Sequence, residues 1–274
     1  MKGGTLLTGA LAAALLAVAA AAVIVSRAGE PEDGAPQKVA DGLPTDGPYR
    51  YRVEYLGVKC GELTLECRRD EFDGRPVFHI IMTGRNSKFF NKIYRVDGRV
   101  DSWVDVETLA TVAYRSDVSE RGKREVISYR VDLESGKVSV DKNGKKSTVD
   151  FEGGPALDPV AFVFRSRVLG GDDGGEFPLD LLTDEGPIAS LCEHGRLKPF
   201  STYSGRRELR RIQVRAVDQE KYGRKGTFVL WIDPGPARTL YRLDFKLGFG
   251  RLLAKLVGEA EGSVDRRPPT PATN

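Results

Sequence analysis

The chain has 274 residues, in which 42 Lys and Arg nearly balance 39 Asp and Glu, and it contains two histidines, His79 and His194. So few histidines leave little scope for general-base catalysis near neutral pH. The sequence also lacks GxSxG, HExxH, CxxC and phosphate-loop motifs, which removes the enzyme classes that those motifs identify.

The amino-terminal end is dominated by an unbroken apolar run over residues 5–25, with Lys2 before it and Arg27 after it. Positive charge on the amino side of such a run favours keeping that side in the cytoplasm. We therefore expect the rest of the chain to be exported, and the protein to be extracytoplasmic, in the periplasm or cell envelope. Residues 1–28 are predicted to be a signal peptide or a membrane anchor.

The apolar run has two candidate cleavage sites and is also long enough to remain uncut. Residues 20–22 and, more weakly, 26–28 offer the small-x-small pattern of a signal peptidase site. A run of ~20 residues also suits an uncleaved membrane helix. Both alternatives stay open, whereas a lipoprotein is disfavoured because the first cysteine is Cys60.

Composition divides the exported part into three regions. Residues 29–48 and 266–274 carry Pro, Gly and polar residues with almost no large apolar side chain. Such stretches bury too little surface to offset the entropy of ordering them, so we predict a flexible linker and a disordered tail. Residues 49–265 form the remaining single domain.

Alternating apolar and polar residues recur along that domain, which predicts antiparallel strands with one buried face. The pattern is clearest in residues 49–55, 127–132 and 241–247, and residues 228–232 are apolar on both faces, as in a covered central strand. About twelve strands are expected. The predicted fold is all-β with one short helix, as a large curved antiparallel sheet or a partly open barrel.

Turn and cap signals fix the positions of a hairpin and of the helix. Asn143-Gly144 predicts a tight hairpin turn. Asp158 followed by Pro159 predicts an N-cap and a first helical residue, with the helix ending before Gly170 and lying over the sheet or plugging an open end. The GGDDGG segment at 170–175 lacks the ligand spacing of a calcium loop and is interpreted as a flexible turn.

Four segments together resemble a bacterial family known as domain of unknown function 3108. They are YRVEYLGVKCGELTLE, YRVDGRVDSWVDVETL, ALDPVAFVFRSR and GTFVLWID…FKLGFGRLLAKLVG, and the resemblance covers about residues 49–258. It implies an exported or lipid-anchored envelope protein with a curved antiparallel sheet. It implies no reaction and no site residues. The chain departs from the family near Leu240, where a proline is expected.

The best candidate for catalysis is Cys192-Glu193-His194. On a strand, Cys192 and His194 point the same way about 7 Å apart, which is too far for a nucleophile–base hydrogen bond unless the chain bends. The favoured interpretation is a small apolar cysteine and a surface histidine. A metal site that adds Cys60 has no support from spacing, so no metal and no cofactor is predicted.

Three cysteines in an exported chain raise the possibility of a disulfide. Cys60 and Cys67 are expected on one strand, facing opposite sides, and therefore cannot pair with each other. Cys67 continues the register of Leu63 and Leu65, which predicts a core position. The remaining pair, Cys60–Cys192, is a weak hypothesis.

Charge is distributed unevenly along the chain. Residues 196–255 hold fifteen Lys and Arg against five Asp and Glu, whereas residues 29–195 are net acidic. Such asymmetry can mark an anionic partner. Arg207, Arg211 and Arg215 are predicted to share a strand face that could bind lipid phosphates or acidic glycans. The alternative is a face neutralised by the acidic half of the chain.

A second charged strand face is expected to be solvated and to have no metal site. Asp97, Asp101 and Asp105 alternate on one strand with Arg95 and Arg99, and are too far apart for a shared metal. They are interpreted as a solvated face with local ion pairs.

These observations predict a non-catalytic envelope protein that binds an amphipathic or anionic molecule, such as a lipid or glycan. One alternative is an assembly or scaffold role, with a sheet edge docking an envelope protein. Another is a hydrolase using Cys192 and His194. A membrane is a partner through residues 5–25 if they are retained, and nucleic acid is not expected because the protein is exported.

Overall fold

The computed structural model describes residues 47–92, 95–151, 155–169, 175–218, 227–246 and 250–259. The predicted signal or anchor, the tail, residues 170–174 and all but the last two residues of the linker lie outside these ranges. Within them, no helix combines the length and apolar character needed to cross a bilayer.

The amino-terminal half of the domain supplies eight strands and one short 3-10 helix. They are β1 (Tyr49–Tyr55), β2 (Val58–Phe72), β3 (Arg75–Asn86), η1 (Phe90–Lys92), β4 (Val96–Asp105), β5 (Thr111–Glu120), β6 (Lys123–Asp132), β7 (Lys137–Lys142) and β8 (Lys145–Asp150).

The carboxyl-terminal half supplies the α-helix and six further strands. They are α2 (Pro159–Val168), β9 (Gly175–Thr183), β10 (Gly186–Thr202), β11 (Gly205–Ala216), β12 (Thr227–Ile232), β13 (Leu240–Lys246) and β14 (Arg251–Glu259).

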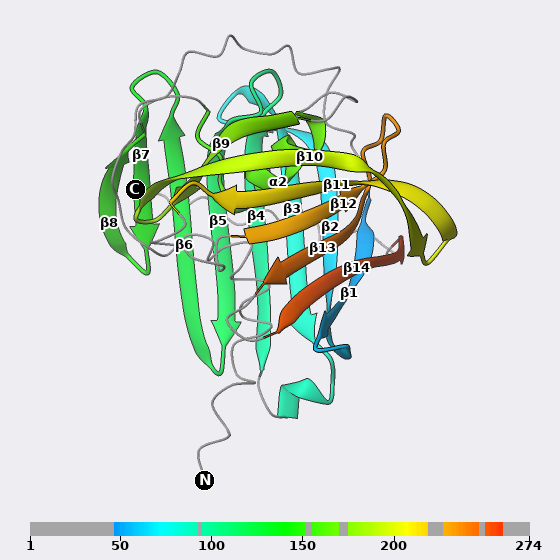
Figure 1. The fold of residues 1–274 in the computed structure, drawn as a ribbon. Coiled ribbons are helices and arrows are strands. Elements are labelled where there is room, and N and C mark those ends of the chain that lie inside the picture. The colour runs from blue at the N-terminus through cyan, green and yellow to red at the C-terminus, as the bar shows by residue number, and fades with distance from the viewer. Residues whose placement is uncertain are drawn as a thin grey trace.

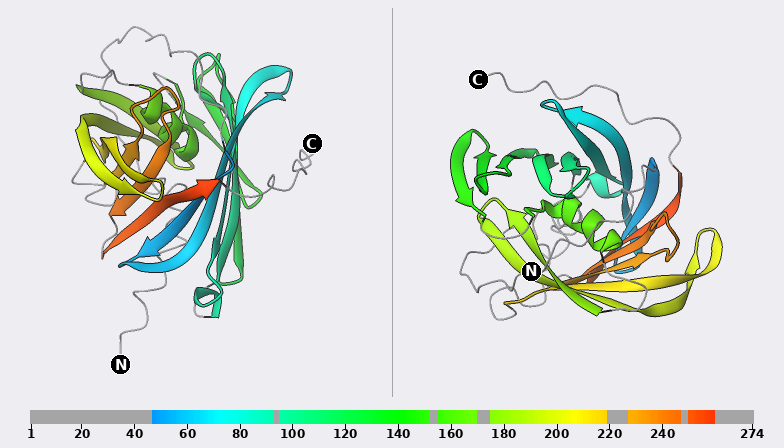
Figure 2. Two further views of the ribbon diagram at one scale, coloured as in Figure 1. Left: turned by 90° about the vertical axis from the view of Figure 1, so that its right-hand side faces the viewer. Right: turned by 90° about the horizontal axis from the view of Figure 1, so that it is seen from above.

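All fourteen strands belong to one antiparallel sheet in the order β8-β7-β6-β5-β4-β3-β2-β1-β14-β13-β12-β11-β10-β9. The first and last strands of the chain therefore lie side by side in the middle of the sheet. The sheet curves strongly, so that β9–β14 cross in front of the long strands β2–β6, with α2 between the two layers (Figures 1 and 2). Strands β8 and β9 are the two edges. The prediction of a curved antiparallel sheet with one helix is confirmed, and the sheet is not closed into a barrel.

The alternation observed in the sequence corresponds to the two faces of this sheet. Tyr51, Val53 and Tyr55 are buried in one continuous apolar core on the concave side, as are Ile127 and Tyr129. The expected hairpin turn also forms, with positive φ angles at Asn143 and Gly144, at 54° and 83°. Both residue types tolerate this left-handed backbone, which a two-residue turn requires.

One expectation about facing is wrong. Cys60 and Cys67 lie on the same strand, β2, yet both point into the concave core. The cause is an irregularity in the pairing with β1, where Val53 pairs with Gly61 but the next residue, Glu54, pairs with Lys59. The extra residue on β2 is Cys60, and such a bulge turns the strand by one position. The core position of Cys67 is confirmed.

Helix α2 begins and ends where the sequence predicts, and it plugs one end of the concave side. The Asp158 side chain caps it, with Oδ1 accepting from the backbone amides of Val160 and Ala161 at 2.8 and 3.1 Å. Its other oxygen, Oδ2, accepts from the hydroxyls of Ser102 on β4 and Thr111 on β5, at 2.6 and 2.8 Å. The cap therefore also fastens the helix to the sheet.

The segment before the helix bridges the two halves of the sheet. The Ala156 carbonyl accepts from the amide of Thr111 at 2.8 Å, and the Leu157 carbonyl accepts from the amide of Leu182 on β9 at 2.7 Å. Helix α2 then packs Phe162 edge-on against Phe228 of β12, with 6.0 Å between ring centroids. One short stretch of chain thus contacts β4, β5, β9 and β12.

We expect Asp158→Ala to lower the free energy of unfolding by about 3 kcal/mol. The change removes a helix cap and leaves two buried hydroxyls and two amides without their acceptor. Urea denaturation measures the loss. The exposed Asp150 of β8 offers a control, and Asp150→Ala should stay within about 0.5 kcal/mol of the wild type. Equal stability of Asp158→Ala and the wild type would contradict this role of the cap.

Candidate functional site

The strand register brings four loops to one end of the sheet. The amide of Ser87 donates to the Cys60 carbonyl, Val96 pairs with Glu120, and Tyr55 pairs with Leu252. We call this the basal end. It comprises residues 56–59, 87–92, 121–123, 246 and 250–251, and η1 and the β5–β6 turn mark it at the bottom of Figure 1.

Helix α2 occupies the opposite, apical part of the concave side. Its cap contacts Thr111, the first residue of β5, whereas the basal end of that strand is Glu120. A ten-residue helix is ~15 Å long, but a ten-residue strand such as β5 extends ~33 Å. The helix therefore cannot cover the concave side down to the basal end.

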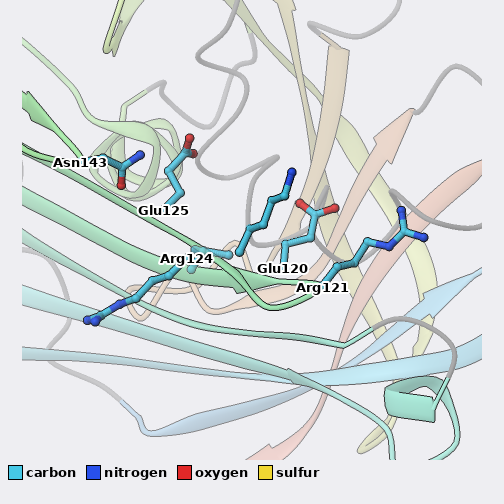
Figure 3. Close-up of a pocket in the computed structure, with 7 residues that line it drawn as sticks. Glu120, Arg121, Arg124, Glu125 and Asn143 are labelled. Atoms are coloured by element: carbon cyan, nitrogen blue, oxygen red, sulfur yellow. The ribbon is translucent and has the colours of Figure 1, made fainter.

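A hollow of about 790 Å³ lies at that uncovered end (Figure 3). This volume falls within the ~300–1,000 Å³ of typical ligand sites. The β5–β6 hairpin and the next turn line it, through Val118, Glu120, Arg121, Lys123, Arg124, Glu125 and Asn143. Val118 is part of the apolar core, so the hollow adjoins apolar packing on one side and charged side chains on the other.

The hairpin pairing explains which of these side chains face inward. Glu120 pairs with Lys123, and Val118 pairs with Glu125, so all four share the concave face. Arg124 has the opposite orientation (Figure 3). Its guanidinium donates to the Asp117 carboxylate. Two carboxylates and two cations thus remain around the hollow, counting Arg121 at the turn.

Burial raises the pKa of Glu120 above its usual value, even though the Arg121 guanidinium lowers it, and the nearby Glu125 adds to the rise. Glu125 is itself close to a cation, with 3.8 Å between its carboxylate and the Lys142 ammonium. The Lys142 ammonium also contacts Asp184 at 2.7 Å. The site is therefore polar at its rim and suits a charged or polar group rather than an entirely apolar ligand.

A second polar group lies inside the concave core, where Cys192 and His194 follow one another on β10. Both lie on the same face of the strand, as predicted, but that face is the inner one, so His194 is buried and its predicted surface position is wrong. Its Nε2 lies 3.3 Å from the Ser166 carbonyl of α2, which can accept but not donate. The ring therefore carries its hydrogen on Nε2. The Cys192 side chain meets the Ser166 hydroxyl instead of the imidazole.

This arrangement lacks the features of a nucleophile and its base. Burial raises the pKa of the Cys192 thiol to about 12 and lowers the pKa of His194 to about 4. Two arginines, Arg210 and Arg238, lower the histidine pKa further. At neutral pH Cys192 is a protonated thiol and His194 a neutral acceptor, so the geometry gives no support to the hydrolase alternative.

The three cysteines are free and buried, so the proposed Cys60–Cys192 disulfide is absent from the structure. The Cys60 thiol donates instead to the Val53 carbonyl at 3.5 Å. Among the described residues, no group of three or more His, Cys, Asp or Glu is arranged to hold a metal ion.

The predicted arginine face exists, but acidic and polar neighbours occupy it. Arg207 lies 3.8 Å from the Asp233 carboxylate, and Arg215 lies 3.1 Å from that of Glu176 on β9. Arg211 donates to the Gln213 side chain. The three side chains share the outer face of β11, away from the hollow.

A buried charged network on the outer face was not anticipated from the sequence. Asp101 is buried rather than solvated: His79 Nε2 donates to it at 2.8 Å, and Arg99 binds it through two nitrogens at 2.7 Å. Burial alone would raise the pKa of Asp101, but these two partners outweigh it and lower that pKa. The His79 ring stacks on Trp103, with 4.7 Å between centroids. The alternation of β4 indicated the face, but only the register with β3 reveals the pairing.

A family model described as a protein of unknown function (DUF3108) matches residues 50–257. A β-barrel-like protein of domain of unknown function DUF1849 from Brucella abortus is similar over 78% of this chain and 97% of its own, with a TM-score of 0.52 and 9% identity. At that identity the likeness concerns the fold alone.

A protein from Bacteroides fragilis, described as exported and with a YmcC-like fold, aligns over 81% of this chain and 100% of its own, with 10% identity and a TM-score of 0.33. No curated protein matches the sequence.

We expect all three cysteines to resist a thiol reagent in the native protein and to react together on unfolding, because each is buried. Mass spectrometry under non-reducing conditions after labelling in denaturant should count three thiols. Rapid native labelling of Cys192 alone would support the hydrolase alternative, and a count of one thiol would restore the disulfide.

We expect His194 to make stability depend on pH. The unfolded histidine takes up a proton near pH 6.5, whereas the folded one does so only near pH 4, so stability falls as the pH drops between these values. The loss reaches up to about 1.4 kcal/mol per pH unit. His194→Gln, which can still donate to Ser166, should lack this component. Urea denaturation of both proteins between pH 7 and 4.5 measures the effect. If the free energy of unfolding changed with pH equally in the wild type and in His194→Gln, the expectation would be contradicted.

Proposed function

Since the chain belongs to the family of unknown function 3108, whose description names no activity, we propose a function from geometry: an extracytoplasmic, non-catalytic protein that holds an amphipathic molecule with an anionic head in the basal hollow. The observation that carries the proposal is the hollow itself, which lies between apolar core and charged rim. Export rests on the apolar amino-terminal run.

The lining of the hollow supports this class of ligand. Val118 and the adjoining core offer apolar contact, while Arg121 and Lys123 offer cations at the turn. Such cations bind phosphate or carboxylate oxygens through charge-assisted hydrogen bonds. The carboxylates of Glu120 and Glu125 would then accept from hydroxyl or amine groups of the same head, which selects against a simple fatty acid.

An assembly role is the second candidate, and one feature favours it. Strand β8 is a sheet edge whose side chains are largely exposed, so a partner strand could add to it. Its Lys145 and Lys146 act against this, because lysines on an edge discourage strand addition. Crosslinking in cells at β8 followed by identification of the partner distinguishes a scaffold from a ligand carrier.

We expect the full chain, purified gently from its own host envelope, to carry one amphipathic molecule in native mass spectrometry. Arg121→Asn together with Lys123→Gln should lower occupancy about tenfold, because two charge-assisted contacts are lost. Asparagine tolerates the positive φ of 54° at residue 121. The bound molecule is identified by extraction and fragmentation.

The matched control is Lys145→Asn with Lys146→Gln, which removes the same charge from β8 outside the hollow. It should keep wild-type occupancy. A chain that emerges at its bare mass, or a ligand lost equally from both variants, would contradict binding in the hollow.

A further inference from the structure

Three large apolar side chains protrude at the basal end. Leu56 is 55% exposed, Val58 56% and Phe89 68%, and they make up half of the exposed large hydrophobic residues in the described part of the chain. Leu56 and Val58 flank the β1–β2 turn at Gly57, and Phe89 precedes η1, where it packs edge-on against Phe90. The structure supplies no packing reason for exposing them.

The same end also carries cations besides Lys59, which pairs with Glu62. Lys88, Lys92, Lys246 and Arg251 are all exposed, and none of the four forms an ion pair with a carboxylate of the described residues. Arg251 adjoins the β1–β2 turn, because its neighbour Leu252 pairs with Tyr55. This contrasts with the outer face of β11, where Arg207 and Arg215 already have acidic partners.

The shape of this surface indicates what it contacts. The apolar side chains stand on two turns that project from the ends of strands, Leu56 and Val58 on one and Phe89 on the other, with η1 extending furthest of the described elements in Figure 1. A groove would suit a peptide, and a flat apolar face would suit a second protein. Protruding apolar tips, among cations that have no carboxylate partner within the described residues, suit an interface into which the tips insert while the cations remain at the level of anionic headgroups.

From this juxtaposition we propose that the basal end docks on the surface of an anionic lipid bilayer, with Leu56, Val58 and Phe89 entering the headgroup layer. The partner is the bilayer itself, and the inference stands whether or not the hollow holds a ligand. If both hold, the hollow opens toward the membrane, because Arg121 and Lys123 belong to the basal end.

The test places a polarity-sensitive fluorophore at the basal end of the full chain. Asn91→Cys gives an exposed attachment site within η1, and Cys60, Cys67 and Cys192 are buried and do not compete for the label. Glu134→Cys, on the exposed β6–β7 turn, labels the apical end. The two sites separate docking of the domain from simple insertion of residues 5–25, which would affect neither fluorophore.

With vesicles of phosphatidylcholine and phosphatidylglycerol, we expect a blue shift from the label at 91 and none from the label at 134. Phosphatidylcholine alone, or high salt, should reduce the fraction shifted about tenfold. No shift at 91 in protein that sediments with the anionic vesicles would overturn the proposal, as would equal shifts at both positions. If the label at 91 shifted to the blue without vesicles, and more so at higher protein concentration, the basal end would contact a second copy of the chain instead.

Variants in the Asn91→Cys background locate the contact. Leu56→Asn with Phe89→Ser should abolish the shift, and Lys88→Gln with Lys92→Gln should weaken it; all four side chains are exposed, so the fold should be retained. Tyr203→Ser with Val217→Thr removes two exposed apolar residues elsewhere and should leave the shift unchanged. A retained shift in the first pair would overturn the proposal. Loss of docking with an occupied hollow would leave the proposed function intact.

Discussion

The Asp158 carboxylate receives four hydrogen bonds in the concave side of the sheet, two from the first turn of α2 and two from hydroxyls of β4 and β5. A strongly curved sheet with free edges has an apolar concave face that water would otherwise reach, and α2 covers the apical part of it. The guanidinium groups of Arg165 and Arg167 also donate from the helix to the backbone carbonyls of Thr108 and Arg238. Its position depends on this buried cap, on the bridge of Leu157 to β9, and on the packing of Phe162.

The length of the helix then determines where the molecule is hollow. The ten residues of α2, nearly three turns, span less than half of the length of strands such as β5, so the basal part of the concave side is left to the side chains of the β5–β6 hairpin. Those side chains are charged at the rim, because the hairpin ends there and its last residues meet solvent. The filled apical part and the hollow basal part of the concave side therefore both follow from one short helix that is fixed at the apical end.

Much of this fold could be predicted from local sequence. Alternation indicated the strands, and Asp158-Pro159 indicated where the helix begins, because both signals act within a few residues. What escaped prediction depends on pairing between distant strands. The bulge at Cys60 reverses its facing, and the register of β3 with β4 brings His79 to Asp101. Cys192 and His194 each contact Ser166 of α2, one through its hydroxyl and the other through its carbonyl. None of the charged hairpin residues that line the hollow was predicted as a site from the sequence, because their place beside the uncovered part of the concave side follows from the strand register and the length of α2.

The pairing of strands also determines which cations have acidic partners. The arginines of the carboxyl-terminal half are numerous, yet Arg215 contacts Glu176, Arg242 contacts Asp244 and Lys255 contacts Glu54, so the net charge of a segment does not identify an exposed basic face. At the basal end, by contrast, Lys88, Lys92, Lys246 and Arg251 have no carboxylate partner among the described residues.

The proposed ligand site and the proposed membrane contact both lie at the basal end, which bears on how a ligand would be exchanged. Moving an alkyl chain through water costs ~0.8 kcal/mol for each exposed methylene group, so a carrier of amphipathic molecules exchanges its ligand fastest where it touches a membrane. A hollow whose rim lies beside the docked tips would let the tail pass between bilayer and protein without full hydration. The anionic head would remain among cations throughout.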